Sequence, residues 1–197
     1  AWATTVNRPE FRELAPFAFY DISFNNVLSG NDSLQVATIQ NVDARYEFYP
    51  SSGEVISFGV FYKQFTNPIE MFFLPGAGSG GTRNFTFGNA ERATSVGAEL
   101  ELRRQLNGLF TEGFFSHVGV MLNAAYIVTE VELGEGARGQ ARRRPLMGQS
   151  PYIVNAGLYY QDRERKLQYN ILYNIIGPRL FAVGTFGTPD IYEMPRN

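Results

Sequence analysis

The chain has 197 residues, a formal net charge of −2 and no cysteine. This length is sufficient for a single all-β domain, and the near-neutral charge argues against a nucleic-acid-binding protein. Without cysteine, a disulfide framework and a thiolate metal site are both excluded. No run approaches the roughly 20 apolar residues of a membrane helix, but this criterion does not detect barrel strands, because half of each strand faces the lumen.

Segments with strand character follow one another along the chain, and no stretch keeps a period of 3.6 long enough to predict a helix. The predicted strands are Ala1–Val6, Val36–Tyr49, Glu54–Phe73, Thr82–Leu106, Phe115–Leu133, Tyr152–Gln161, Lys166–Leu180 and the beginning of another near Ile191. Their succession predicts an all-β fold, an antiparallel up-and-down meander in which each strand pairs with its sequence neighbour. We expect this meander to be curved but not closed by this chain alone.

The stretch "VDARYEF" has a strict period of two. Asp43, Arg45 and Glu47 alternate with apolar or aromatic residues between Val42 and Phe48. Because successive side chains of a strand point to opposite faces, this pattern predicts a sheet with one apolar and one charged face. A soluble sandwich and a membrane barrel both contain such sheets, and they differ in which face is the protein's interior.

The connections between the predicted strands alternate between long and short. The short ones are "PSSGE", "NGLFTEG" and "QDRER", whereas the long ones are residues 7–34, "PGAGSGG", "GEGARGQARRRP" and residues 177–190. Outer-membrane barrels sort their connections in this way, with short turns facing the periplasm and long loops outside. Aromatic residues beside the short turns suit a girdle at the membrane interface; they are Tyr46, Phe48, Tyr49, Tyr159, Tyr160 and Tyr169. The sequence therefore predicts that the charged face lines a lumen and that the apolar face meets lipid.

Four stretches carry a family resemblance: "NRPEFRELAPFAFYD", "NVDARYEFYPSSGEVISFGVFYKQFTNPIE", "NAERATSVGAELELRRQL" and "RRRPLMGQSPYIVNAGLYY". They resemble the C-terminal barrel of TonB-dependent outer-membrane receptors, particularly the large receptors of Bacteroidetes-type bacteria. The resemblance covers nearly the whole chain. It implies a transmembrane β-barrel of roughly twenty-two strands, of which this chain supplies about seven and part of an eighth.

The resemblance also implies a domain organisation and a set of partners. Residues 1–197 are expected to be a single partial β-barrel domain, a fragment in which the plug domain and the terminal strands are absent. The implied location is the bacterial outer membrane. The implied partners are outer-membrane lipid, the remainder of the receptor chain, and a TonB-type energising protein that acts through the missing N-terminal part. No nucleic acid and no cofactor are implied.

The function that the resemblance implies is energy-coupled capture and import of a scarce nutrient, which is an iron chelate, haem, cobalamin, a glycan or a peptide. Two other functions are compatible with the strands alone. One is a passive outer-membrane porin or an adhesin-type barrel. The other is a soluble β-sandwich that binds carbohydrate, although sorted loops and a polar second face argue against it.

Catalytic chemistry is not indicated, and we expect no enzyme. His117 is the single histidine, so the usual metal-ligand sets cannot be assembled. The carboxylates at Asp43, Glu47, Glu99 and Glu101 fall on a strand period. They are interpreted as lumen charges paired with Arg45 and Arg103 rather than as an acid–base pair.

Candidate ligand contacts lie in the long connections, since loops carry variable function on rigid scaffolds. The candidates are Arg8, Glu10, Phe11, Arg12, Phe72, Phe73, Phe85, Phe87, Arg142, Arg143 and Arg144. The arginine cluster suits phosphate or lipopolysaccharide, although a solvated loop is the favoured interpretation. The phenylalanines suit either a ligand path or interface packing. The "GAGSGG" run has no lysine and no following helix, so it is not a phosphate-binding loop.

Overall fold

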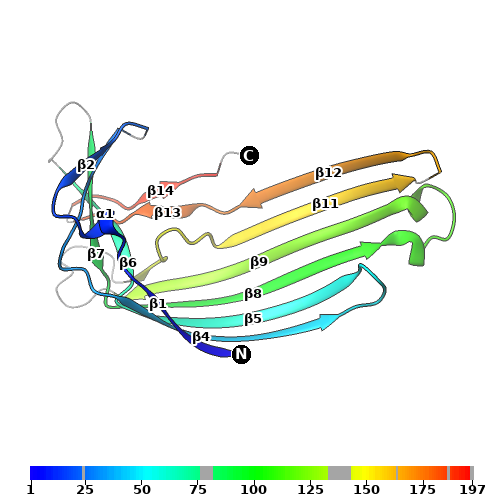
Figure 1. Cartoon of the computed structure of the whole chain (residues 1–197), viewed down its shortest axis with the longest axis horizontal. Coiled ribbons are helices and arrows are strands. Elements are labelled where there is room, and N and C mark those ends of the chain that lie inside the picture. Colours follow the sequence, from blue (N-terminus) through cyan, green and yellow to red (C-terminus); the bar gives the residue numbers. More distant parts are fainter. Residues whose placement is uncertain (24, 76–81, 133–142, 163, 186, 196–197) are drawn as a thin grey trace.

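A computed structural model of the chain describes residues 1–23, 25–75, 82–132, 143–162, 164–185 and 187–195. Its main sheet is a curved wall of long strands in the order β1-β4-β5-β8-β9-β11-β12, with β10 paired to β9 (Figure 1). These strands are β1 (Trp2–Asn7), β4 (Ala37–Phe48), β5 (Val55–Thr66), β8 (Arg92–Gln105), β9 (Val118–Glu132), β10 (Arg143–Arg144), β11 (Tyr152–Asp162) and β12 (Leu167–Ile176). Every pairing within the wall is antiparallel, and the sheet does not close, which confirms the predicted meander.

The long connections contain a second, four-stranded sheet that was not predicted. Its order is β2-β3-β7-β6, and β3 pairs with β7 in parallel. The elements of the long connections are α1 (Phe11–Leu14), β2 (Ala18–Asp21), β3 (Asn26–Ser29), β6 (Ile69–Leu74), β7 (Arg83–Asn89), β13 (Arg179–Ala182) and β14 (Ile191–Glu193). The short connection between β8 and β9 contains η1 (Leu106–Gly108) and η2 (Phe114–His117). Within the part of the chain that the structure describes, no helix is long and apolar enough to cross a membrane.

Three predicted strands are each divided in two, and backbone chemistry explains the breaks. β5 and β6 are separated at Asn67, whose φ is +55°, and Pro68, which has no N–H to donate. β7 and β8 bend at the same level, where the Asn67 N–H donates to the Glu91 carbonyl and the Ala90 N–H donates to the Pro68 carbonyl. Likewise, the Gly177–Pro178 pair separates β12 from β13. Beyond each break, the chain turns away from the plane of the wall.

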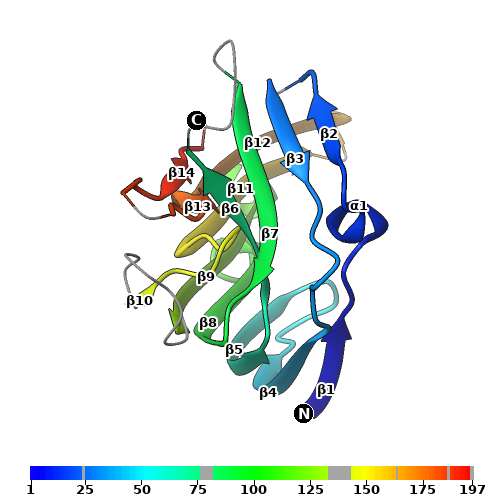
Figure 2. The same ribbon diagram turned by 90° about the vertical axis from the view of Figure 1, so that its left-hand side faces the viewer.

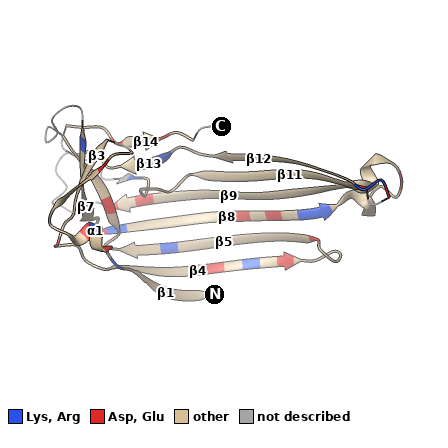
Figure 3. Cartoon of the chain, turned by 45° about the horizontal axis from the view of Figure 1, so that its top comes forward, with Lys and Arg blue, Asp and Glu red and all other residues tan. Residues whose placement is uncertain are grey.

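The wall has one apolar and one charged face, as the period of two predicts. Paired rows on the apolar face contain Val42, Tyr62, Val96 and Val128, then Tyr46, Phe58, Leu100 and Ala124. Paired rows on the other face contain Arg45, Gly59, Glu99 and Ala125, then Glu47, Ser57, Glu101 and Asn123. Figure 3 shows these charges at alternate positions along β4 and β8. None of the described residues covers the apolar face, on which Tyr46 is 70% and Phe58 53% exposed.

The charged face is the concave one. Viewed from the end that carries the long connections, the small sheet stands on the concave side of the wall (Figure 2). Leu146, in one of these connections, packs against Ala93 and Val131, and the Leu146 N–H donates to Thr129 Oγ1 at 3.0 Å. These contacts lie on the same face as Arg45, because the residues involved share its parity in the strand register. The convex face is therefore the apolar one.

Two glycines of the concave face accommodate aromatic rings from neighbouring strands. Gly97 pairs with Phe61, and Gly119 pairs with Tyr159. A Cβ atom at either glycine would overlap the ring of its partner. An aromatic side chain laid over a strand glycine covers backbone that would otherwise be exposed and helps to fix the register.

Candidate ligand-binding surface

The short helix α1 presents the first group of candidate residues. Its capping box is formed by Glu10 and Glu13, and the Glu10 N–H donates to Glu13 Oε2 at 2.9 Å. Arg8, Glu10, Phe11 and Arg12 are all exposed, and Phe11 is 78% exposed. The helix lies on the concave side of the wall beside β2 and β3 (Figure 2).

The four candidate phenylalanines belong to β6 and β7 and have different environments. Phe85 is completely buried; its ring lies 5.7 Å from that of Phe73 and 5.9 Å from that of Phe181. Phe72, on the opposite face of β6, packs over Gly88, and Phe87 is half-buried. Phe85 therefore forms the core of the small sheet, while Phe72, Phe73 and Phe87 retain partial exposure.

The candidate arginines are not equivalent either. Arg142 lies outside the described residues, and Arg143 is described only through its backbone pairing with Glu132. Arg144 is buried, and its guanidinium makes a two-pronged ion pair with Glu70, in which Nη1 donates to Oε1 at 2.9 Å and Nη2 donates to Oε2. The Arg144 side chain thus joins the connection before β11 to strand β6, and in this structure it does not offer its charge to solvent.

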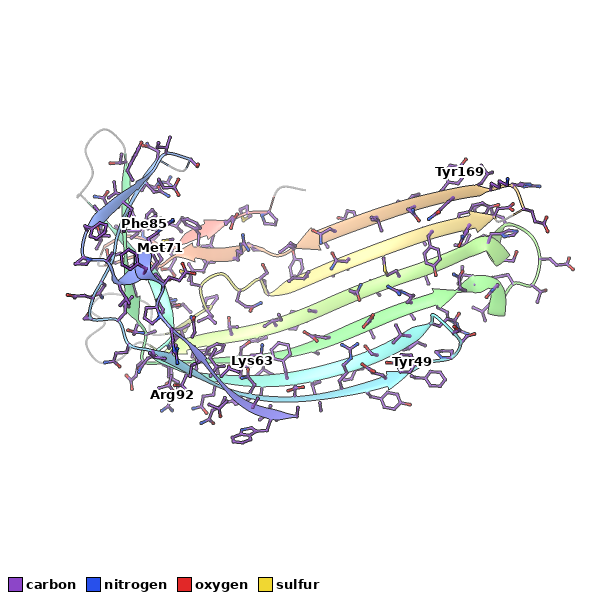
Figure 4. All side chains as sticks on the ribbon, viewed as in Figure 1. Tyr49, Lys63, Met71, Phe85, Arg92 and Tyr169 are labelled. Carbon is purple, nitrogen blue, oxygen red and sulfur yellow. The ribbon has the colours of Figure 1, made fainter. Side chains whose placement is uncertain are left out.

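Backbone hydrogen bonds attach the connection after β12 to the same strand. The Phe73 N–H donates to the Val183 carbonyl at 2.8 Å, and the Val183 N–H donates to the Met71 carbonyl at 2.9 Å. Thr185 Oγ1 donates to the Phe73 carbonyl at 2.8 Å. Figure 4 shows Met71 and Phe85 close together at this end of the molecule. Strand β6 is therefore flanked by β7 on one side and by Val183 on the other.

Together these contacts tie the described parts of all four long connections into one packed unit, which we call the outer body (residues 8–23, 25–35, 67–75, 82–91, 143–151, 177–185 and 187–193). Its first connection joins through the parallel β3–β7 pair and through Asn31 Nδ2, which donates to the Phe87 carbonyl at 2.9 Å. Its interior contains Phe85, Leu180, Val183 and the Glu70–Arg144 pair, all fully or nearly fully buried. Sequence reasoning did not single out Glu70, Leu180 or Val183. The one available signal was a lone carboxylate, Glu70, inside the apolar run "PIEMFFL".

An exposed ion pair joins the two strands at the end of the outer body. Arg179 Nε donates to Glu193 Oε2 at 2.7 Å. The hydrogen bond from Arg179 lowers the pKa of Glu193 below its usual value, and the same contact raises the pKa of Arg179. Both side chains are about half exposed, so solvent screens the interaction and it contributes little to stability.

The concave face below the outer body carries a polar network. Arg45 bridges two carboxylates, with Nε 2.7 Å from Glu47 Oε1 and Nη2 2.7 Å from Glu101 Oε2. Arg103 has its Nη2 4.0 Å from Met121 Sδ. The predicted pairing of lumen carboxylates with Arg45 is therefore confirmed for Glu47 and Glu101.

No arrangement for bond-making chemistry is found in the described part of the chain. His117 lies against the ring of Tyr160, with ring centroids 5.6 Å apart. Among these residues, no three His, Asp or Glu side chains are grouped so that they could hold a metal ion.

Comparison with known proteins gives a consistent result. The family described as "TonB dependent receptor-like, beta-barrel" matches residues 1–192. The ferric enterobactin receptor PfeA from Pseudomonas aeruginosa, solved in complex with BCV-L6, is 18% identical with a TM-score of 0.57, and the match covers 91% of this chain and 25% of that one. The siderophore receptor PirA from the same bacterium is 20% identical with a TM-score of 0.55, and the match covers 92% and 32%.

PirA from Acinetobacter baumannii is also similar, with 17% identity, a TM-score of 0.54, and coverage of 92% of this chain and 27% of that one. Identities at this level show a shared fold and nothing about the ligand. The chain spans about a quarter to a third of the length of these receptors. The search among curated proteins found no match.

Proposed function

Since the chain belongs to the TonB-dependent receptor-like β-barrel family, we propose that it forms part of the wall and the outer vestibule of an energy-coupled receptor that imports a scarce nutrient. Members of this family are outer-membrane receptors rather than enzymes. The observation that carries the proposal is the outer body: four long connections converge on the concave side of one end of the wall. The site of capture is therefore assigned to the lumen end that faces outward.

The ligand contacts that we propose are the candidate residues that remain accessible on the outer body. Arg8, Glu10, Phe11 and Arg12 of the first connection are exposed beside the mouth of the barrel. Phe72, Phe73 and Phe87 of the second add partly exposed aromatic surface. Arg142 and Arg143, of the third connection, are proposed as further contacts from the sequence alone. Guanidinium groups beside aromatic rings suit an anionic ligand with apolar parts.

Candidate ligands are an iron chelate, haem, cobalamin, a glycan and a peptide. Ferric chelates are the first to test, because the similar solved structures include a ferric enterobactin receptor and siderophore receptors. Import would also require the remainder of the receptor chain, with its plug, and a TonB-type energising protein. A passive porin or adhesin would share the wall but would have no need of an energy source.

The decisive experiment measures uptake of a radiolabelled ferric siderophore by cells that express the full receptor. We expect uptake that stops when the energising protein is deleted or the proton gradient is collapsed. Uptake that continues under both conditions would instead assign the protein to the passive barrels. A panel containing haem, cobalamin, oligosaccharides and peptides, tested in the same cells, identifies the ligand class if ferric chelates are not taken up.

The contact residues are tested by a matched pair of variants in the same receptor. Arg8→Ala/Arg12→Ala is expected to weaken binding of the transported anionic ligand while the barrel still assembles. Arg92→Ala is the control, because Arg92 belongs to the row of Thr38 and Thr66 on the convex face. Equal affinities in the double variant and the control would remove α1 from the binding surface.

A further inference from the structure

The small sheet of the outer body ends in a strand that is paired on one side only. The strand order is β2-β3-β7-β6, so β2 and β6 are the two edges of this sheet. The edge at β6 is occupied, because the Phe73 N–H and the Met71 carbonyl form hydrogen bonds with Val183. Among the described residues, β2 pairs with β3 alone. The sheet is therefore covered at one edge and open at the other.

The open edge lies over the space around which the wall curves. In Figure 1 the strands of the small sheet run across the direction of the wall strands, at one end of the wall. Figure 2 shows the sheet extending from β6, beside the wall, to β2, on the open side of the curve. In a closed barrel this space is the mouth of the lumen, and further strands complete the ring on the open side. Strand β2 thus points toward the part of the mouth that the remainder of the receptor encloses.

The sequence of β2 does not protect this edge. Natural sheets often guard an exposed edge with lysine, proline or a bulge, since unpaired N–H and C=O groups invite another strand to pair. Strand β2 reads "AFYD" and contains no lysine or proline, and its register with β3 has no shift. Large apolar side chains in and around it are exposed, namely Phe17 (53%), Tyr20 (56%) and Ile22 (83%). These features are typical of an edge that another segment covers in the complete molecule.

The edge is held in position by the rest of the first connection. The Asn31 N–H donates to the Glu13 carbonyl at 2.6 Å, which attaches the segment after β3 to α1. Gly30 lies so close to the backbone of Ala15 that a Cβ atom at position 30 would overlap it. A strand that is already fixed loses little conformational entropy when another strand adds to it, and this favours strand addition.

We propose that an outer connection from the remainder of the receptor chain adds a strand to β2, so that the small sheet continues across the mouth of the barrel. The present chain spans 25% to 32% of the similar receptors, so much of the barrel, with its own outer connections, belongs to the remainder. A second receptor in the same membrane cannot reach β2, because this strand lies on the concave side, inside the circumference of a closed barrel (Figure 2). Main-chain hydrogen bonds supply the attraction, and the side chains of Phe17 and Tyr20 supply apolar contact area.

The first test is residue-resolved amide hydrogen exchange at Ala18, Phe19, Tyr20 and Asp21 in the full receptor, purified without ligand. Alternate residues of an antiparallel strand direct their N–H groups to opposite neighbours, so half of these amides face β3 and half face the open edge. We expect both sets to exchange at least ~10-fold more slowly than the same amides in an unstructured peptide. Protection of the set that faces β3, with unprotected exchange of the other set, would show an open edge and overturn the proposal.

The second test identifies the segment that covers the edge. Each outer connection of the remainder of the receptor is replaced in turn by a Gly-Ser linker. One replacement should speed exchange of the edge-facing set by at least ~10-fold and leave the set that faces β3 protected, which also serves as the control for folding. The proposal is wrong if no single replacement has this effect.

Two other occupants have distinct signatures in the same assay. Protection of the edge-facing set that rises with receptor concentration would assign the edge to a second copy of the receptor. Protection that appears only after addition of a tryptic digest of casein would assign it to a peptide ligand. Either result overturns the proposal, and none of these measurements depends on uptake of a nutrient, so the proposed import function is tested independently.

Discussion

Removal of Arg144 is expected to loosen the outer body, because it leaves the Glu70 carboxylate buried without its partner. The side chains are 2% and 0% exposed, respectively, so neither charge is compensated by bulk water. Breaking a buried ion pair by removing one partner typically costs about 3–5 kcal/mol. At 1.36 kcal/mol for each factor of ten, this penalty raises the equilibrium constant for local opening by roughly 10²-fold to 5 × 10³-fold.

The assay is amide hydrogen exchange on the full receptor with Arg144→Met, followed by mass spectrometry of peptides from β6. When opening is fast and reversible, the exchange rate of a protected amide follows the local opening equilibrium. The amides of β6 that pair with β7 should therefore exchange faster by the factor above. Amides of β5 serve as the internal reference, since this strand belongs to the wall and should be unaffected.

The matched control is the double variant Glu70→Met/Arg144→Met, which replaces the ion pair by apolar side chains of similar size. Such replacements are often neutral or stabilising, so the double variant should recover most of the protection of β6. If Arg144→Met leaves exchange in β6 unchanged, the pair does not hold the outer body together. If the double variant is as unprotected as the single one, the penalty comes from lost packing and not from an uncompensated charge.

Two further changes test the wall and the outer body separately. Gly119→Ala should lower the free energy of unfolding of the receptor by about 1–3 kcal/mol, because the added Cβ overlaps the Tyr159 ring. The double variant Gly119→Ala/Tyr159→Leu should recover part of this stability in urea unfolding of the reconstituted receptor. Unchanged stability of the single variant would contradict the packing of Tyr159 over Gly119. The Glu193–Arg179 pair should support β13–β14 fully above the unfolded pKa of Glu193 and progressively less as pH falls through its lowered folded pKa. The effect should be small, because both side chains are about half exposed. Protection factors of β14 amides, which are exchange rates corrected for the intrinsic pH dependence of exchange, check this against pH, and Glu193→Gln should remove the decrease.

The wall was predictable from the sequence because its signal is local and repeated. A period of two over Val42–Phe48 assigns faces without knowledge of any partner strand, and a shift of one residue would expose the wrong set. The charged side chains of Asp43, Arg45 and Glu47 therefore fix the register of β4 within the sheet. The alternation of long and short connections also indicates which end of the barrel faces outward, and no single strand carries that information.

The outer body was not predictable in the same way, because its contacts join distant parts of the chain. The Glu70–Arg144 pair spans 74 residues, and the Thr185–Phe73 hydrogen bond spans 112. Neither leaves a periodic pattern in the sequence. The arginine run containing Arg144 was interpreted as a solvated loop or an anion site, and only the structure places one of its members beside a buried carboxylate.

The breaks between the wall and the outer body are marked in the sequence by prolines, which the predicted strands nevertheless include. Pro68 and Pro178 each lack an N–H, and a proline inside a predicted strand argues against its continuation. Long apolar runs on both sides favoured a single strand at each position. In the structure the strand ends at the proline, and the hairpin bends at Asn67, whose N–H donates to the Glu91 carbonyl.

The central claim is that the convex apolar face meets lipid and the concave charged face meets water, and one pair of neighbouring residues tests it. Leu100 belongs to the convex row of Tyr46 and Phe58, whereas Glu99 pairs across Gly59 toward Arg45 on the concave face. Leu100→Cys and Glu99→Cys are made separately in a full receptor without other cysteines and treated in membranes with a water-soluble maleimide. We predict labelling at position 99 and resistance at position 100, where a fluorophore should also be quenched by brominated lipid. Equal aqueous labelling of both thiols, or no lipid quenching at position 100, would contradict the assignment of the convex face to the membrane.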